Sequence, residues 1–459
     1  MSAPGHTATT LNLTDLLENS QIGPLQIRVF TLCMLCLIMD GFDVQAMGYT
    51  APAVLKEFGI TGIQLGGLFS AANFGVLIGS LVFSMVADKV GRRPVLVGAT
   101  FFFSVLTIAT AYAQTFPQLL WLRFISGIGL GCIIPNATSL VAEFSPKKSR
   151  VTLMMCITVG FTAGGALGGF VAAWMIPAFG WRSVFVFGGT VPLLIAIIMA
   201  VSLPESLQFL AVRKTKLEQL ARWLKQLDPT IRIDANTKYV ANEGSRGGFL
   251  LSHLFQEGRA PVTILLWIVN FTNIMVLYSL SNWLATVVTG MGYTTRESVL
   301  VSTTLQVGGT VGTFGLAWLI ARKGFIPMLI ATFAVATVAI AFIGQPGMTL
   351  AMLFVIVFVA GWCIVGGQPG INALSATFYP TYLRSTGVGA GLGVGRAGAI
   401  VGPSVGGMLF AAQWTSQQLF WAAAVPAFVS MLTMLAMRVA MKQPVTPVTP
   451  VPMTEPAGH

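Results

Sequence analysis

Charged side chains are scarce in this chain of 459 residues. Asp, Glu, Lys and Arg make up 9% of it, whereas 55% of the residues are hydrophobic and the mean hydropathy is +0.79. A soluble domain carries about 25% charged residues. The composition therefore excludes an ordinary soluble protein and predicts an integral membrane protein. The first apolar run is too long for a signal-peptide core, so we expect it to be the first membrane helix.

Histidine and cysteine are also rare. All three histidines, His6, His253 and His459, lie outside the apolar stretches, so no Ser/His/Asp group can be assembled, and the glycines lack the strand and helix context of a nucleotide site. The cysteines lie inside apolar stretches without metal-ligand spacing, and we expect free thiols that pack as small apolar residues. They are Cys33, Cys36, Cys132, Cys156 and Cys363. The sequence thus predicts no enzyme, no metal site and no cofactor.

Apolar stretches long enough to cross a bilayer are abundant. Spans of about 20 residues are helices, because backbone groups in lipid must bond within the segment and the strands of membrane barrels are much shorter. The sequence therefore predicts an all-α membrane protein with twelve transmembrane helices. They are expected near residues 27–50, 62–86, 95–114, 118–141, 151–176, 183–203, 260–284, 298–320, 326–344, 349–372, 385–410 and 418–440.

Basic residues fall on alternate loops rather than in one patch, although the formal net charge is +11. Lys and Arg cluster after the second, fourth, sixth, eighth and tenth predicted helices, and the intervening loops hold few of them. By the positive-inside rule, both chain termini are cytoplasmic. The basic excess then indicates topology and contact with the lipid bilayer, and we expect no nucleic-acid partner.

The halves of the chain resemble each other. At an offset near 234 residues, 135–150 aligns with 369–384, matching two prolines, a Phe, an Ala and the closing Arg. Such a parallel repeat places a cavity between the halves near the middle of the membrane, as in transporters that work by rocking. We expect an N-terminal segment at 1–26, a six-helix bundle at 27–206, a linker with an amphipathic helix at 207–258, a second bundle at 259–441 and a disordered tail at 442–459.

Two aspartates interrupt the first apolar span. Asp40 and Asp43 share one helix face at a spacing of three residues. A charge at the centre of a membrane helix costs roughly 2.5 kcal/mol or more, so intramembrane carboxylates usually have a function. Together they can share a proton, bind a cation or pair with a cationic side chain. The alternative is an ion pair that only locks helices together.

Two arginines also lie inside predicted spans. Arg396 is about 11 residues into its helix, near mid-membrane at 1.5 Å per residue, whereas Arg123 is only about five residues from a helix end. Arg123 can therefore extend outward to the interface as a structural residue. A guanidinium suits a carboxylate because it presents a planar fork of donors, so Arg396 is the candidate for an anionic group of a substrate.

A short motif follows the second span. The run Asp88-Lys89-Val90-Gly91-Arg92-Arg93 resembles the D-[RK]-x-G-[RK]-[RK] loop of the major facilitator superfamily, and residues 40–43 resemble the D-G-x-D signature of its aromatic acid:proton symporter family. The resemblance covers about residues 20–440. It implies the major facilitator fold, with Asp40 and Asp43 as the proton-coupling pair. It also implies a conformational gate made of Asp88, Gly91, Arg92, Arg93, Glu143, Arg150 and Arg384.

The chain departs from this pattern at two places. Ser84 stands where the loop motif usually begins with Gly, and Ala321-Arg322 stands where the second half often has Asp-Arg. The cytoplasmic latch is therefore expected to depend on Asp88. A glycine-rich run at 160–169 resembles the fifth-helix motif of exporters, but Gly165 occupies its proline position, which disfavours an antiporter.

Polar and aromatic residues on the helices that line the cavity in this superfamily complete a candidate pocket. Tyr278 and Trp283 are expected to flank an aromatic ring. The alternative for each residue is a structural role, since Asn and Gln join membrane helices and Trp and Tyr favour the interface. The candidates for substrate binding are Arg396, Arg123, Asn136, Tyr278, Asn282, Trp283, Gln306, Gln368 and Asn372, with Asn270 and Asn273 nearby.

These residues and the resemblance together predict a proton-coupled symporter. It would import an aromatic carboxylate such as a hydroxybenzoate across the inner membrane by alternating access, as a monomer with the proton gradient as its only energy source. A symporter for another organic acid or a polyol, a sensor that binds without transport and, least favoured, an exporter are the alternatives.

Overall fold

The computed structural model describes residues 10–12, 16–18, 20, 22–213, 217–227, 238–240, 251–380 and 382–441. The predicted tail at 442–459 and parts of the predicted N-terminal segment and linker lie outside these ranges. Within them, eleven helical spans are long and apolar enough to cross a membrane. A further helix of 35 residues, α2 (Pro24–Phe58), contains both aspartates.

These helices confirm the predicted all-α membrane fold. The helix α2 is longer than the predicted span 27–50 and continues through Pro52 to Phe58. The fourth predicted span is built from two helices that follow each other, α5 and α6. The spans after α2 are α3 (Gly62–Val90), α4 (Arg92–Thr110), α5 (Phe116–Leu130) with α6 (Ile133–Phe144), α7 (Arg150–Phe179), α8 (Arg182–Ser202), α11 (Ala260–Gly290), α12 (Thr295–Lys323), α13 (Phe325–Phe342), α14 (Leu350–Phe378), α15 (Arg384–Ala411) and α16 (Ser416–Ala440).

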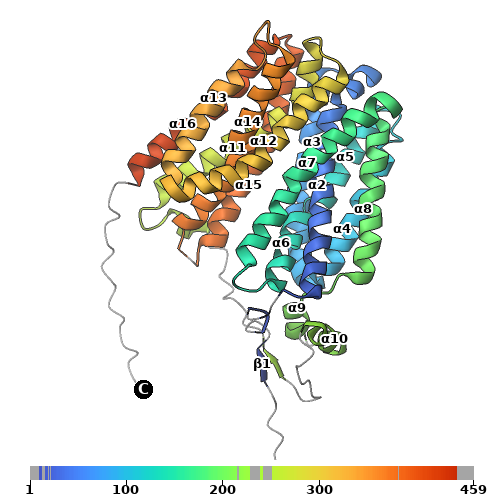
Figure 1. Cartoon of the computed structure of the whole chain (residues 1–459), viewed down its shortest axis with the longest axis vertical. Helices are drawn as coiled ribbons and strands as arrows, with labels where there is room; N and C mark the ends of the chain where they lie inside the picture. Colours follow the sequence, from blue (N-terminus) through green and yellow to red (C-terminus); the bar gives the residue numbers. More distant parts are fainter. Residues whose placement is uncertain are drawn as a thin grey trace, which may run out of the picture.

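The helices form two bundles that lie side by side, α2 to α8 in blue to green and α11 to α16 in yellow to red (Figure 1). In the first bundle α2 packs on α7, α3 on α5 and α4 on α8. In the second bundle α11 packs on α15, α12 on α14 and α13 on α16, which is the same pairing in the same order. Arg150 and Arg384, aligned in the sequence repeat, each begin a helix at the equivalent place. The repeat in the sequence is therefore also a repeat of packing.

The bundles touch each other mainly through α3 with α15, α7 with α12 and α2 with α11, and α2 also touches α12. Glycine permits this approach. A Cβ atom on Gly66 would stand 2.7 Å from the Pro403 carbonyl oxygen, and one on Gly48 would stand 2.4 Å from the Ser281 carbonyl oxygen. Such close approach of backbones is typical of membrane helices.

These contacts lie in the middle of the molecule and at the end remote from the start of α2. Ser70 of α3 donates a hydrogen bond to the Ile400 carbonyl at 2.6 Å and lies 2.7 Å from the Ser404 hydroxyl. Near the midpoint of their helices, the Thr310 hydroxyl donates to the Thr162 hydroxyl at 3.1 Å. The bundles are therefore joined at one end of the molecule.

The described part of the linker holds two short helices, α9 (Leu207–Arg213) and α10 (Leu217–Leu227), where the sequence predicted one amphipathic helix. A 3-10 helix, η1 (Leu251–Phe255), precedes α11. The sequence did not predict a pair of three-residue strands outside the bundles, β1 (Thr10–Asn12) and β2 (Lys238–Val240), which run parallel with Thr10 opposite Lys238. Both strands lie beyond the end of the first bundle at which α2 begins (Figure 1).

The N-terminal segment also contacts the loop between α6 and α7. Leu17 is 2% exposed, and the backbone N–H of Lys147 donates to the Glu18 carbonyl at 3.1 Å. The Glu18 carboxylate pairs with Arg150 at 3.2 Å. The segment before α2 is thus fixed to the first bundle.

Candidate functional site

The helix α2 is central, because it packs against α6, α7 and α8 of its own bundle and against α11 of the other. Asp40 is 2% exposed and Asp43 is fully buried. Between them, a Cβ atom on Gly41 would stand 1.9 Å from the Phe161 carbonyl oxygen, so only glycine lets α7 cross at this level. The sequence therefore places two carboxylates on the most enclosed turn of α2.

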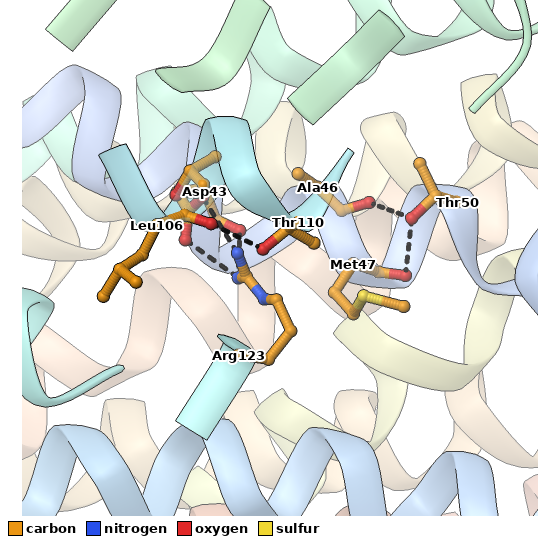
Figure 2. A network of polar contacts seen from close by, with 8 residues as sticks. Asp43, Ala46, Met47, Thr50, Leu106, Thr110 and Arg123 are labelled. Atoms are coloured by element: carbon orange, nitrogen blue, oxygen red, sulfur yellow. Dashed lines mark hydrogen bonds and ion pairs between the residues drawn. The ribbon is translucent and has the colours of Figure 1, made fainter. Parts of the chain in front are cut away.

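Asp43 is held by a complete set of donors (Figure 2). The two terminal nitrogens of Arg123 from α5 bind its two carboxylate oxygens at 3.1 and 2.8 Å, and the Thr107 hydroxyl from α4 donates to Oδ1 at 2.9 Å. Arg123 also donates to the backbone carbonyl of Asp43 at 3.3 Å. A two-pronged, charge-assisted contact of this kind is the strongest ion-pair geometry available to an arginine.

The structure excludes the alternative in which Arg123 extends outward to the interface. Its side chain is 2% exposed, and its guanidinium carbon lies 5.4 Å from the centre of the Phe185 ring. A bidentate partner inside the membrane compensates its charge, so the side chain gains nothing by reaching water. Arg123 and Asp43 instead join α5 to α2. For Asp43 this corresponds to the alternative given above, an ion pair that locks helices together.

Asp40 has a different environment from Asp43. Its carboxylate makes no hydrogen bond or ion pair with any residue that the structure describes. The charged groups that act on it are Arg396 of α15 and Asp43. Asp40 therefore lies buried without a direct partner, and the nearest compensating charge comes from the other bundle.

Arg396 is half-buried on α15. Its Nη1 donates to the Tyr278 hydroxyl of α11 at 3.3 Å, and it makes no ion pair within the described ranges. Close packing fixes its helix, because a Cβ atom on Gly398 would stand 2.3 Å from the Phe271 carbonyl oxygen. The structure thus brings together two predicted residues, Arg396 and Tyr278, and leaves the guanidinium available for an anion.

The predicted amide side chains of the second bundle form a network. Asn273 donates to Gln368 at 2.7 Å, and Gln368 donates to Asn270 at 3.0 Å and to Asn372 at 3.2 Å. These bonds join α11 to α14 inside one bundle. The arrangement corresponds to the alternative role of amides as connections between helices.

Another polar group crosses the bundle interface; it contains the predicted Gln306 and two residues that the sequence analysis did not select, Gln45 and Ser281. Gln306 of α12 and Gln45 of α2 both donate to the Ser281 hydroxyl of α11, at 3.2 and 3.3 Å. Both glutamines are almost fully buried. Ser281 and Gln45 could have been found as polar residues in the middle of apolar spans, directly beside Asn282 and the aspartates.

Trp283 and Asn136 make contacts within the protein. The Trp283 indole N–H donates to the Pro403 carbonyl at 3.0 Å, and its ring packs between Phe69 and Phe410. Asn136 donates to the Cys132 carbonyl of its own helical turn at 2.8 Å. These geometries favour packing roles over contact with a ligand.

Four of the predicted gate residues lie where α3, α4, α6 and the linker meet: Gly91, Arg92, Arg93 and Glu143. Gly91 has a φ of 111°, which favours glycine, and the backbone N–H groups of Arg92 and Arg93 both donate to the Glu205 carboxylate at 3.1 Å. Arg92 also forms an ion pair with Glu143. A carboxylate at the N-terminus of α4 is favourable for the helix dipole as well.

The other gate residues do not join this group. Arg150 pairs with Glu18 instead, and Arg384 is exposed without an ion pair in the described part of the chain. Asp88 lies in the last turn of α3, and its side chain is outside the described residues. The structure therefore adds Glu205 and Glu18, which sequence reasoning did not assign, to the charged residues at this end.

Comparison with known proteins agrees with this geometry. Residues 33–389 match the family described as the Major Facilitator Superfamily. The chain is 36% identical over 434 residues to the 4-hydroxybenzoate transporter PcaK of Pseudomonas putida, covering 93% of this chain and 95% of that protein. It is 34% identical over 427 residues to the gallate transporter of Pseudomonas putida, with the same two coverages.

Solved structures show the same fold. The D-xylose-proton symporter superposes with a TM-score of 0.71 at 16% identity, over 89% of this chain and 97% of that one. A bacterial homolog of the human lysosomal transporter Spinster, in an inward-facing conformation, gives 0.71 at 19% identity, over 93% of this chain and all of that one. The chain is a transporter rather than an enzyme, and it belongs to the Major Facilitator Superfamily, in the family that holds these aromatic acid transporters.

Proposed function

We propose that this protein imports an aromatic carboxylate together with a proton across the inner membrane. The observation that carries the proposal is the position of Asp40. It is buried without a bonded partner among the described residues, and it interacts electrostatically across the bundle interface with Arg396, which has no ion-pair partner there. The names of its relatives, transporters of 4-hydroxybenzoate, gallate and benzoate, support the class of substrate.

Charge balance gives the mechanism. The Asp43–Arg123 pair is neutral by itself, so the net charge of the site depends on Asp40 and Arg396. When the site is empty and Asp40 is ionised, these two charges cancel. When Asp40 carries a proton and Arg396 holds the substrate carboxylate, the charge of Arg396 is cancelled by that carboxylate. Binding of the proton or of the substrate alone leaves one uncompensated charge, which is costly in a closed, dry cavity.

Only the two neutral states can therefore close and cross the membrane readily. Binding of the proton is therefore coupled to binding of the acid, because only the two together stabilise the closed state. A ligand shifts a conformational equilibrium only by its unequal affinity for the two states. The expected stoichiometry is one proton for each monovalent acid, and transport should be electroneutral. The proton gradient then supplies the energy, without any cofactor.

Sidedness follows from the distribution of basic loops. With both termini in the cytoplasm, the end at which the bundles are joined faces away from the cytoplasm, and the site opens inward. Every hydrogen bond between the bundles in the described residues lies at that end or in the middle, which agrees with a transporter ready to release its substrate. The site lies wholly within one chain, so we expect a functional monomer.

Purified protein in liposomes tests the proposal. Labelled 4-hydroxybenzoate should accumulate when the outside is acidic, a protonophore should abolish the accumulation, and a membrane potential alone should not drive it. Counterflow of labelled against unlabelled substrate, without any gradient, should also occur. Accumulation that follows the potential and ignores the pH gradient would contradict the mechanism, and binding without counterflow would indicate a sensor.

A further inference from the structure

A small cavity lies between the bundles and is lined by Tyr278, the residue to which Arg396 donates a hydrogen bond. It has a volume of about 30 Å³, and its lining comes from α2, α3 and α5 of the first bundle and from α11 of the second. A water molecule needs roughly 10–15 Å³ of such volume, so the cavity holds one or two hydroxyl-sized groups and not a benzene ring. Most of its wall is apolar, and its polar lining residues are Asn73, Arg123, Tyr278 and Asn282.

Asn282 is the polar lining residue whose whole side chain has no hydrogen-bond partner among the described residues. Its side chain is 4% exposed and makes no hydrogen bond with any residue in the described ranges. Its residue lines the cavity, so its amide calls for a ligand or a water as a partner. Asn73, which lines the same cavity from α3, uses its amide N–H to reach the Phe69 carbonyl at 3.0 Å and has its own oxygen left over.

The other two polar groups of the cavity each have a partner already, although the Arg123 Nε–H has none among the described residues. Arg123 is bound by both oxygens of Asp43, so it offers no free charge for a carboxylate. The Tyr278 hydroxyl accepts a hydrogen bond from Arg396. The cavity therefore suits a small neutral group that can both donate and accept hydrogen bonds, which describes a hydroxyl.

The spacing along α11 fits the length of an aromatic acid. Tyr278 and Asn282 are four residues apart and face the same side of the helix, so at 1.5 Å per residue they are separated by about 6 Å along its axis. This separation is comparable with that between the carboxyl carbon and the hydroxyl oxygen at opposite ends of a para-substituted ring. A ring lying along α11 with its carboxylate at Arg396 would therefore point its far substituent at Asn282.

We propose that Asn282 determines specificity by binding the ring hydroxyl of a hydroxylated aromatic acid in this cavity, with the Asn73 oxygen opposite. The inference rests on the proposed function and deepens it, because Asn282 would make the transporter prefer hydroxylated aromatic acids to unsubstituted ones. The amide accepts the hydroxyl proton or donates to its oxygen. An unsubstituted ring leaves the amide unbonded, which is the situation in which hydrogen-bonding sites discriminate most strongly.

The test compares two acids in binding experiments on purified protein, with 4-hydroxybenzoate and benzoate as probes. Wild type should bind the hydroxylated acid at least about tenfold more tightly. Asn282→Leu, which keeps the size of the side chain and removes its hydrogen bonds, should lose most of this preference, with the affinity for benzoate retained. Asn282→Ser should recover part of it, since a hydroxyl can bond the ligand directly or through a water.

Asn136→Leu is the matched control, because Asn136 is also 4% exposed but bonds its own helix and does not line the cavity. Any loss it causes should be equal for the two acids. The inference is overturned if Asn282→Leu weakens both acids equally, or if wild type binds both equally. If wild type binds neither acid, the proposed function fails and the inference fails with it.

Discussion

Asp40 and Asp43 are one helical turn apart on α2, and the structure gives them opposite surroundings. The Asp43 carboxylate receives three hydrogen bonds from Arg123 and Thr107, all from its own bundle, whereas Asp40 has no bonded partner in the described chain and the cation that acts on it belongs to the other bundle. In the proposed rocking motion of the bundles, the surroundings of Asp43 stay constant and those of Asp40 change. The proposed roles of the two residues are therefore a brace for Asp43 and a switch for Asp40.

Breaking the brace should have the largest effect. Asp43→Asn leaves the Arg123 charge buried without its carboxylate, which costs roughly 3–5 kcal/mol of stability. The thermal unfolding midpoint of the detergent-solubilised protein should fall strongly, and transport should be lost. The double variant Asp43→Asn with Arg123→Met should recover most of the stability. An Asp43→Asn protein as stable as wild type would show that this pair does not brace α2.

Replacing the guanidinium group of Arg396 should have the next largest effect. Arg396→Lys keeps the charge, but an ammonium cannot make a two-pronged contact with a carboxylate. Substrate affinity should fall by roughly 2–5 kcal/mol, or between tens and thousands of fold in dissociation constant. The control is the amide of the same acid, which should lose little more on mutation. Equal losses for acid and amide would mean that the carboxylate is held elsewhere.

A smaller change weakens the brace without breaking it. Thr107→Val removes the hydroxyl that donates to Asp43 and keeps the shape of the side chain, so stability should fall by about 1.5–3 kcal/mol. Thr110→Val is the matched control on the same helix, because Thr110 donates only to the Leu106 carbonyl one turn before it (Figure 2). Thermal unfolding should rank Thr107→Val clearly below Thr110→Val. If Thr110→Val lowered the unfolding midpoint more than Thr107→Val, Arg123 alone would hold Asp43 in place.

The switch should show the smallest effect on stability and a selective effect on function. Asp40→Asn removes no hydrogen bond, and a neutral amide costs less to bury than a carboxylate, so the unfolding midpoint should not fall. Uphill accumulation should nevertheless disappear, while counterflow continues because the charge of the site no longer depends on a proton. Proton-driven accumulation by Asp40→Asn at the wild-type level would move the coupling group to another residue.

The fold could be predicted from the sequence because membrane spans depend on length and composition alone. Twelve apolar stretches, the alternate basic loops and the repeat between 135–150 and 369–384 were sufficient for the helices and their two bundles. The parallel pair β1–β2 could not be predicted, since three-residue strands far apart in the chain carry no periodic signal.

The site was predictable in its residues and not in its pairings. Asp40, Asp43, Arg123 and Arg396 are conspicuous because each charge interrupts an apolar span. The sequence could not say that Arg123 binds Asp43, because that choice depends on how α5 packs beside α2. For the same reason it could not separate Trp283, which donates to the Pro403 carbonyl, from Asn282, whose side chain makes no hydrogen bond with the part of the chain that the structure describes.

The strand pairing outside the bundles has a consequence for how the chain is made. β1 precedes the first bundle in the chain, and its partner β2 follows roughly 230 residues later, after the whole first bundle. At about 5–20 residues per second, β1 is made on the order of ten seconds or more before β2. Glu18 can contact Lys147 and Arg150 as soon as the α6–α7 loop has been made, whereas β1 can pair with β2 only when that part of the linker has been synthesised. The β1–β2 pair therefore forms only after the whole first bundle has been synthesised.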